Sequence, residues 1–354
     1  MKGLILSGGY GTRLRPLTHS QQKQLIPVAN KPILFYAIED VIEALVREIG
    51  IVIGSNKEQV ITTVKSAEWN ADITFIYQDE PKGIAHAVKI SKDFIGDEPF
   101  ILYLGDNILK EGIMKHAEEF KKQKPDASVL LTHVSNPQQF GVAELDSNNN
   151  VKRFIEKPKR PPSDLALVGV YFFAPTIFKA IEHLKPSWRG QLEITDAIQW
   201  LIDNGYKINA TIVKDWWKDT GKVEDVLEAN RLVLDDLRPF NKGTIESGAL
   251  IQGRVSVDEG TIILKGSVLK GPVIVGKDCT IGPATYIGPY TSIGDNCEII
   301  GAEVESSIVM NNTTINCKKK IVDSLIGTNV KISESAELPK GYRFVLGDSS
   351  DVRI

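Results

Sequence analysis

The sequence predicts an α/β fold in which a mostly parallel sheet precedes a left-handed parallel β-helix of hexapeptide repeats. In the first two-thirds of the chain, runs typical of strands alternate with runs typical of helices, an order that favours a sheet covered on both faces. Beyond Pro239 the helical spacing ends and aliphatic residues recur every six positions. We therefore expect two domains, residues 1–238 and 239–354.

The alternation begins at the N-terminus. The predicted strands are Lys2–Ser7, Ile49–Gly54, Ile73–Tyr77 and Phe100–Leu104, and the predicted helices are Pro32–Leu45, Asn56–Ala67 and Ile84–Phe94. Sheets of this Rossmann-like kind bind ligands beyond the carboxyl ends of their strands. Gly8–Arg13 and Gly105–Asn107 both fall at such ends, so we expect the site there.

The pattern changes from about Phe140. We predict strands over Phe140–Asp146, Val151–Lys157 and Leu165–Ala174, a hairpin turn at Ser147–Asn150, and helices over Leu192–Asn204 and Lys222–Leu237. We interpret these elements as an insert that covers the ligand end of the sheet. Arg238-Pro239 ends the last helix.

The hexapeptide repeat is carried by nine aliphatic residues spaced six apart: Ile251, Val257, Ile263, Leu269, Val275, Ile281, Ile287, Ile293 and Ile299. Small residues such as Cys279 and Cys297 recur at the fifth position. After Gly301-Ala302 the phase slips by three, and Ile308, Ile326, Ile332 and Leu338 resume it. Three hexads make one triangular turn, so Cys279 and Cys297 should stack in the core as free thiols.

Composition narrows the function classes. Lys and Arg number 42 against 45 Asp and Glu, a net charge of -3, which gives no indication of nucleic-acid or membrane binding. The N-terminal apolar run is too short for a signal peptide, and no stretch is long enough to span a membrane. We expect a cytoplasmic protein.

The segment Gly8-Gly9-Tyr10-Gly11-Thr12-Arg13 is a candidate phosphate loop. Glycines let backbone N–H groups approach phosphate oxygens, and Arg13 adds a charged planar donor. Leu14 and the Gly-Thr-Arg order depart from both common phosphate-loop patterns, so spacing alone leaves a plain glycine turn equally open. Lys23, a second cation nearby in sequence, favours the phosphate interpretation.

Two aspartates and one Glu-Lys pair are the other candidates. Asp106 follows a predicted strand and Asp219 precedes a predicted helix, where each by itself suits an Asx turn or an N-cap. Together they could hold Mg²⁺, which takes one or two carboxylates plus substrate phosphate. Glu156-Lys157 could bind a sugar phosphate, although the motif taken by itself favours a surface ion pair.

At this point the chain resembles a known family. The motifs that carry the resemblance are Gly8–Arg13 with Lys23, Gln78–Ala85, Gly105–Asn107, Phe140–Val142, Glu156–Pro158, Trp188–Asp196 and Trp217–Gly221. They occur in the order typical of sugar nucleotidyltransferases and are most similar to glucose-1-phosphate thymidylyltransferases. The hexapeptide tail is similar to that of the long form, so the resemblance covers essentially the whole chain.

The resemblance implies a reaction of dTTP with glucose 1-phosphate that gives dTDP-glucose and pyrophosphate. It implies catalytic roles for Arg13, Lys23, Asp106, Lys157 and Asp219, with Mg²⁺ on Asp106 and Asp219. The nucleotide-binding residues it implies are Gly8, Gly9, Gly11, Thr12, Arg13, Gln24, Gln78, Gly83 and Asp106. The sugar-phosphate residues it implies are Asn107, Gly141, Glu156, Lys157, Gly169 and Arg189.

Two departures and three alternatives accompany this hypothesis. Phe140 stands where short members of the family carry Tyr, which removes a hydroxyl beside the sugar, and Gln22 replaces a small residue before Lys23. The alternatives are a UTP-dependent relative, a bifunctional acyltransferase and a non-catalytic regulatory homologue. No histidine lies in the β-helix to serve as an acyltransferase base, and the charged candidates are all present. The flat faces of the coil suit a homo-oligomer.

Overall fold

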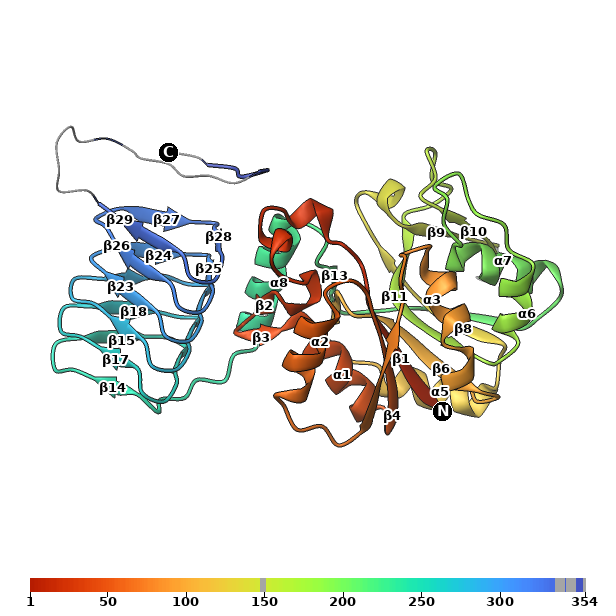
Figure 1. The fold of residues 1–354 in the computed structure, drawn as a ribbon, viewed down its shortest axis with the longest axis horizontal. Helices are drawn as coiled ribbons and strands as arrows, with labels where there is room; N and C mark the ends of the chain where they lie inside the picture. Colours follow the sequence, from red (N-terminus) through yellow and green to blue (C-terminus); the bar gives the residue numbers. More distant parts are fainter. Residues whose placement is uncertain (147–150, 335–340, 342–347, 353–354) are drawn as a thin grey trace. The chain divides into compact units, whose positions relative to one another are not determined.

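The computed structural model describes residues 1–146, 151–334, 341 and 348–352 (Figure 1). The predicted turn at Ser147–Asn150 and the predicted core residue Leu338 lie outside this range. The chain forms two compact units, which we call the sheet unit and the coil unit. The sheet unit is Met1–Tyr10, Gln21–Leu25 and Ile33–Asp219, and the coil unit is Gly11–Ser20, Ile26–Pro32 and Thr220–Ile354.

The sheet unit is built on one mixed nine-stranded sheet with the order β10-β9-β11-β6-β1-β4-β5, in which β8 joins β11 and β12 joins β8. The strands are β1 (Lys2–Ser7), β4 (Glu48–Ile53), β5 (Asp72–Tyr77), β6 (Phe100–Leu104), β8 (Ala127–His133), β9 (Gly141–Leu145), β10 (Val151–Glu156), β11 (Leu165–Phe173) and β12 (Ile208–Ile212). A separate two-stranded sheet pairs β7 (Asn107–Leu109) with β13 (Trp217–Asp219). The α/β prediction is confirmed.

The insert interpretation is wrong in one respect, because β9, β10 and β11 extend the main sheet. β11 runs antiparallel to β6 and β8, whereas β1 is parallel to β4 and β6. All nine residues of β11 are buried. A strand that is apolar along its whole length needs neighbours on both edges and cover on both faces.

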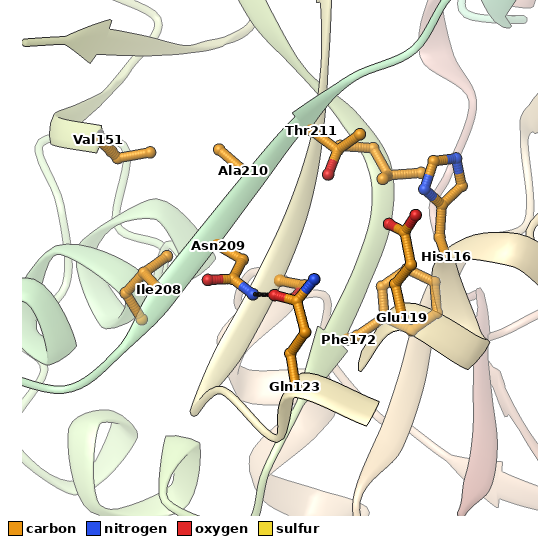
Figure 2. A pocket seen from close by; sticks show the side chains of 11 residues that line it. His116, Glu119, Gln123, Val151, Phe172, Ile208, Asn209, Ala210 and Thr211 are labelled. Atoms are coloured by element: carbon orange, nitrogen blue, oxygen red, sulfur yellow. Dashed lines mark hydrogen bonds between the residues drawn. The ribbon is translucent and has the colours of Figure 1, made fainter. Parts of the chain in front are cut away.

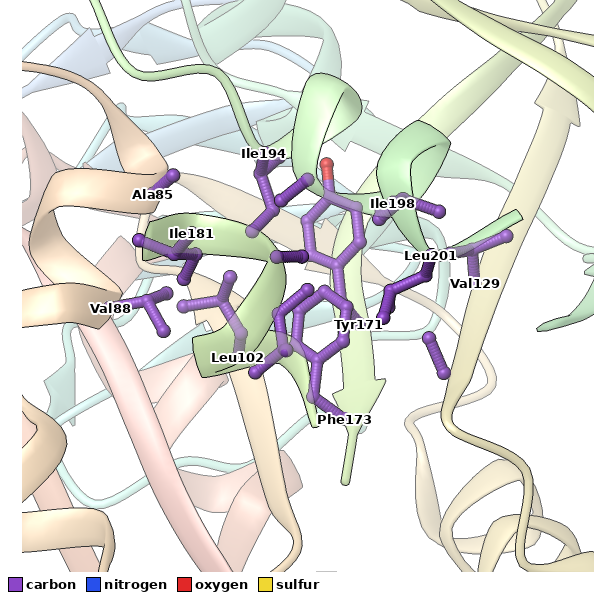
Figure 3. Close-up of a cluster of buried hydrophobic side chains, with 14 of the residues drawn as sticks. Ala85, Val88, Leu102, Val129, Tyr171, Phe173, Ile181, Ile194, Ile198 and Leu201 are labelled. Atoms are coloured by element: carbon purple, nitrogen blue, oxygen red, sulfur yellow. The ribbon is translucent and has the colours of Figure 1, made fainter. Parts of the chain in front are cut away.

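Helices cover both faces of this sheet. They are α1 (Ile33–Glu43), α2 (Lys57–Lys65), α3 (Ile84–Ile90), α4 (Lys92–Ile95), α5 (Met114–Gln123), α6 (Ile177–Glu182) and α7 (Ile194–Asp203). Along β6, Leu102 packs in one hydrophobic cluster while Ile101 and Tyr103 pack in the other, which is the alternation of a strand buried on both faces. Figure 3 shows the first cluster, in which α3 and α7 meet Tyr171 and Phe173, whose rings stack 5.8 Å apart. The single helix predicted over Ile84–Phe94 is divided into α3 and α4.

The coil unit contains a left-handed parallel β-helix with three sheets (Figure 1). One sheet stacks β14 (Thr244–Ile245), β17 (Ile262–Ile263), β20 (Thr280–Ile281), β23 (Glu298–Ile300), β26 (Thr314–Asn316) and β29 (Lys331–Ser333). The second stacks β15 (Leu250–Gln252), β18 (Val268–Lys270), β21 (Tyr286–Ile287), β24 (Glu303–Glu305) and β27 (Lys320–Val322). The third stacks β16 (Val255–Val257), β19 (Val273–Val275), β22 (Thr291–Ile293), β25 (Ile308–Val309) and β28 (Leu325–Ile326).

The hexad prediction is confirmed up to Ile299, since Ile263, Ile281 and Ile299 stack in register and are fully buried. The predicted phase after Gly301 is wrong at Ile308. Val309 pairs with Ile293 and continues the core, whereas Ile308 pairs with Ser292. The reason is a shorter coil, because Val309 follows Ile293 by 16 positions instead of 18. Ile326 and Ile332 do continue the stack.

Cys279 and Cys297 are buried free thiols, as predicted. The backbone N–H of Cys297 donates to Cys279 Sγ at 3.4 Å, and that thiol donates to the carbonyl of Gly294 at 3.0 Å. Thr261 has the same role in the preceding coil, where its hydroxyl accepts from the N–H of Cys279 at 2.9 Å. The thiols therefore belong to a ladder of hydrogen bonds between coils.

A helix covers one side of the β-helix. α8 (Val223–Asp235) contacts β22 and also the hairpin of β2 (Pro27–Val28) and β3 (Lys31–Pro32). Buried Asn230 joins them: its Oδ1 accepts from Ala29 N at 2.8 Å and from Ser292 Oγ at 2.7 Å, and its Nδ2 donates to Tyr290 O at 3.1 Å. Across the described residues, no helix is both long and apolar enough to cross a membrane.

Candidate active site

The loops after β1 and β4 approach each other closely at the carboxyl edge of the sheet. A Cβ atom at Gly54 would lie 2.7 Å from the carbonyl oxygen of Gly8, so only glycine fits there. Gln22 braces the predicted phosphate loop, because its Nε2 donates to the carbonyls of Ser7 and Gly9 at 2.9 Å each. It also donates to Oε1 of Gln24, a buried predicted site residue, at 2.7 Å. Gln22 thus holds the loop, a role that its departure from the family pattern did not indicate.

The predicted nucleotide-binding residues Gln78 and Gly83 lie near the same edge. Gln78 follows β5 and is 6% exposed, and its Oε1 lies 3.3 Å from the position that a Cβ of Gly8 would take. Gly83 has φ +106°, and a side chain there would overlap the carbonyl of Leu192. Gly83 is therefore fixed by close backbone approach, and the Gln78 amide lies against the glycine loop.

Lys23 and Asp106 form a buried ion pair, although 83 positions separate them in the sequence. Burial alone would raise the pKa of Asp106, but the Lys23 ammonium and a hydrogen bond from Asn107 hold that pKa below its ordinary value. Asp106 is therefore ionised. The arrangement places one cation and one carboxylate at the end of β6, as the phosphate hypothesis requires.

Asn107 organises the neighbouring side of the site. Its Nδ2 donates to Asp106 Oδ1 at 2.9 Å, and its Oδ1 accepts from Trp217 Nε1 at 2.6 Å. A Cβ at Gly169 would lie 2.6 Å from Asn107 Oδ1, so glycine is required for the amide to cross β11. The predicted sugar-side residues Asn107 and Gly169 are thus in contact.

Asp219 reaches the same place through β13. In the β7–β13 pair, Asp219 lies opposite Asn107, whose chain neighbour is Asp106. The described residues hold no cluster of three or more His, Cys, Asp or Glu side chains suited to a metal. The carboxylates of Asp219, at the end of β13, and of Asp106, just before β7, nevertheless match the one or two that Mg²⁺ takes alongside substrate phosphates.

A second charged cluster gathers the predicted sugar-phosphate residues. Arg189 Nη1 lies 3.2 Å from Glu156 Oε1 and 3.3 Å from Glu193 Oε1. Thr195 Oγ1 donates to Glu156 Oε2 at 3.3 Å, and a Cβ at Gly141 would lie 3.2 Å from that same oxygen. Burial, followed by the nearby Glu193 carboxylate, raises the pKa of Glu156. Two carboxylates thus hold one guanidinium.

Lys157 has φ +41°, in the left-handed region that residues with side chains seldom occupy. Its N–H donates to the carbonyl of Phe140 at 3.0 Å, which fixes this conformation at the end of β10. Such backbone strain is concentrated at functional sites. The end of β10 therefore holds Lys157 in a backbone conformation that is uncommon for a residue with a side chain.

Three predicted residues, Gly11, Thr12 and Arg13, belong to the coil unit. Gly11 is left-handed, with φ +60°, and its carbonyl accepts from Thr18 Oγ1 at 2.8 Å. A Cβ at Gly221 would lie 2.7 Å from Arg13 Nη2, so the guanidinium packs against the chain just after Asp219. The Trp217–Gly221 motif therefore contains the candidate metal ligand Asp219 and also Gly221, which makes room for Arg13.

Sequence reasoning missed Gln22, His86 and Glu193. Each contacts a predicted residue, namely Gly9, Gln78 and Arg189 respectively. Glu193 was visible within the Trp188–Asp196 motif, and its position beside an arginine four residues earlier was a usable signal. Gln22 and His86 offered none, because their contacts depend on how the loop after β1 and the start of α3 fold rather than on a spacing within one element.

A cavity of about 270 Å³ lies elsewhere, beside edge strand β12 (Figure 2). Its polar lining residues include His116, Glu119, Gln123, Asn209 and Thr211. No predicted site residue lines it. The candidate site is therefore defined by clustered charges at the strand ends.

A glycine-rich loop, cations beside carboxylates at the ends of parallel strands, and a following β-helix define an enzyme that acts on phosphate groups. The family model described as nucleotidyl transferase matches residues 2–236, and the one described as GMPPB C-terminal domain matches residues 269–353. The chain therefore belongs to the nucleotidyl transferase family.

Known proteins are similar over the whole chain. A glucose-1-phosphate thymidylyltransferase of Streptomyces antibioticus is 48% identical, covering 100% of this chain and 99% of its own. The low-salt glycan biosynthesis nucleotidyltransferase Agl11 of Haloferax volcanii is also 48% identical, covering 100% of both chains. A Bacillus anthracis structure described as a putative glucose-1-phosphate thymidylyltransferase with sucrose is 36% identical with a TM-score of 0.62, covering 67% of this chain and 96% of its own.

Proposed function

We propose that this nucleotidyltransferase transfers a thymidylyl group from dTTP to glucose 1-phosphate, giving dTDP-glucose and pyrophosphate. The observation that carries the proposal is the pair of charged clusters, one after the end of β6 and one at the end of β10. One cluster joins Lys23 to Asp106, and the other joins Arg189 to Glu156. The full-length similarity to a protein named for this reaction supports it.

The triphosphate is assigned to the glycine loop. Backbone N–H groups of Gly8, Gly9, Gly11 and Thr12 bind its oxygens, and Arg13 and Lys23 offset the charge of the departing pyrophosphate. Gln78 and Gly83 face the base, and Gln24 supports the nucleotide side of the loop. The bracing of this loop by Gln22 keeps the donors preorganised.

The sugar phosphate is assigned to the second cluster. Lys157 and Arg189 bind its phosphate, while Glu156 accepts hydrogen bonds from sugar hydroxyls. Gly141 and Gly169 leave room for the side chains of Glu156 and Asn107, which face the sugar. The contact of Arg189 with two carboxylates keeps its guanidinium in place before the substrate arrives.

The reaction needs no general base, because the sugar phosphate is already anionic. Its oxygen attacks the α-phosphorus, and the bond to the pyrophosphate oxygen breaks in line. Asp106 and Asp219 would hold Mg²⁺, which supplies charge neutralisation on the phosphates when bound. The side chains contribute positioning and charge stabilisation.

The same proposal includes three broader assignments. Residues 1–238 form the nucleotidyltransferase domain and residues 239–354 the β-helix domain. The protein acts in the cytoplasm as a homo-oligomer assembled through its coil. It binds neither nucleic acid nor membranes.

A pyrophosphate-release screen tests the reaction. Purified protein with Mg²⁺ is supplied with dTTP, UTP, CTP, GTP or ATP, each combined with glucose 1-phosphate or another sugar 1-phosphate. We expect the highest kcat/KM for dTTP with glucose 1-phosphate and a lower value for UTP, since one methyl group discriminates by roughly 1–3 kcal/mol. A purine triphosphate or a different sugar phosphate giving the highest value would refute the assignment.

A further inference from the structure

Gln78 has a polar partner that the proposed reaction leaves unused. Its Nε2 lies 2.9 Å from Nδ1 of His86, a half-buried residue of α3. The opposite end of the same amide, Oε1, faces Gly8 at the end of β1. The His86 contact therefore determines which end of the amide is directed away from the loop.

Nδ1 of His86 accepts from the Gln78 NH₂ group when the imidazole is neutral and carries its proton on Nε2. Burial lowers the pKa of its imidazole, and the positive charges of Lys82 and Lys89 act in the same direction against the smaller opposite effects of Asp79 and Glu80. The ring is therefore neutral near pH 7. A neutral imidazole carries one N–H and one acceptor nitrogen, and only an acceptor Nδ1 satisfies the Gln78 NH₂ group.

The direction of an amide matters for reading a pyrimidine. Thymine and uracil present an N3–H donor beside an O4 acceptor, whereas cytosine presents an N3 acceptor beside an N4 amino donor. A glutamine amide can satisfy either pair, because turning it by half a rotation exchanges its C=O and NH₂ ends. An amide that is free to turn therefore discriminates weakly between the two kinds of base.

We propose that His86 is a specificity-determining positioning residue that fixes the direction of the Gln78 amide and so selects thymine or uracil over cytosine. The inference rests on the proposed function, in which Gln78 faces the base. With Nε2 held by His86, Oε1 accepts from N3–H and the second amide hydrogen is donated to O4. Cytosine opposes this order with an acceptor against Oε1 and a donor against the NH₂ group.

The test measures the ratio of kcat/KM for dTTP to kcat/KM for dCTP, with glucose 1-phosphate as the second substrate. His86→Lys replaces the acceptor with a group that can only donate. The Gln78 amide can then form a hydrogen bond with residue 86 only by turning its Oε1 toward it. We expect the ratio to fall roughly tenfold or more, as for an unsatisfied buried polar group, while the KM for glucose 1-phosphate stays at its wild-type value.

His183→Lys is the matched control. His183 stacks on Trp200 at 4.9 Å and hydrogen-bonds the backbone of Lys179, away from every predicted site residue. Its replacement should leave the nucleotide ratio unchanged. An equal fall in both variants overturns the inference. Circular dichroism melting shows whether each variant is folded at the assay temperature.

His86→Leu keeps the proposal testable if His86→Lys does not fold. It removes the acceptor without adding a donor, so the ratio should fall by a smaller factor. An unchanged ratio in a folded His86 variant overturns the inference, while the proposed function stands if the wild type still prefers dTTP. A wild type that prefers purine triphosphates overturns both.

Discussion

The two units bury polar groups of different kinds. The buried polar side chains described in the coil unit are uncharged, as in Thr261, Ser292 and Asn230, whereas the sheet unit buries Lys23 and Glu193. Burying charge is costly unless the group is paired, and paired buried ions often stabilise a fold less than apolar packing does. The coil therefore resembles a structure optimised for stability, and the candidate site at the carboxyl ends of the strands resembles one that retains charge for chemistry.

The sharpest test of this difference between the two units concerns Asp106 and Asp219. Asp219→Asn keeps the side-chain shape and removes one charge, so kcat should fall roughly 10²–10³-fold at saturating Mg²⁺, as for loss of a preorganised electrostatic group. Asp106→Asn should do the same but also removes the ion pair between Asp106 and buried Lys23.

Steady-state kinetics and thermal melting of both variants separate these effects. Asp164→Asn is the control, since Asp164 pairs with His133 on the surface. Near-normal turnover by both site variants would remove the metal assignment. That result would also leave the buried charges at the carboxyl ends of the strands unexplained.

The next effect distinguishes the two substrates. Lys157→Ala should raise the KM for glucose 1-phosphate roughly 10–100-fold, the loss expected for one hydrogen bond to a charged group, with little change in the KM for dTTP. Lys159→Ala, two residues further on an exposed turn, is the matched control. The opposite ranking of the two KM values would contradict the sugar-phosphate role.

A comparable test in the coil concerns stability. Asn230→Leu keeps the volume but leaves the N–H of Ala29, the carbonyl of Tyr290 and the hydroxyl of Ser292 without this partner. The free energy of unfolding should fall by about 2–4 kcal/mol in urea titrations. Ser292→Ala removes one of these bonds and should cost about 1 kcal/mol. Equal costs would mean that Asn230 is not the shared link.

The same contrast explains what the sequence could predict. The strands Lys2–Ser7 and Phe100–Leu104 were predicted with the bounds that the structure has, because buried parallel strands are continuous apolar runs. The coil core was predictable from its period as far as Ile299. The prediction failed at Ile308 because this coil is two residues shorter, and a fixed six-residue period cannot indicate where a coil is shortened.

The site was predictable only where the family pattern names a residue. Asp106 and Lys23 were both candidates, but their ion pair depends on how loops after distant strands meet. Gln22 and His86 act through contacts that their local spacing did not indicate, whereas the i,i+4 spacing of Glu193 from Arg189 was a usable signal. The division of the glycine loop between the two units at Tyr10 and Gly11 was equally invisible in the sequence.

The smallest expected effect is a pH dependence of stability at Glu156. The pKa of Glu156 is raised in the folded state by burial and then by Glu193. A raised pKa favours the protonated form, so its stabilising effect is present below the ordinary value of 4.5 and is lost as pH rises through the folded value. Glu156→Gln removes this titration, so the free energy of unfolding of the variant should rise relative to that of the wild type between pH 4 and pH 7.

Glu144→Gln is the control with the opposite sign. Hydrogen bonds from Lys152 and Arg153 lower the pKa of Glu144, so its contribution is present above the ordinary value and lost as pH falls. That variant should therefore lose stability relative to the wild type toward pH 7. Urea unfolding at both pH values measures the two trends. If Glu156→Gln followed the trend of Glu144→Gln, the ionised Glu156 carboxylate would stabilise the sheet unit. The charged residues of the sheet unit would then not lower its stability relative to the uncharged coil.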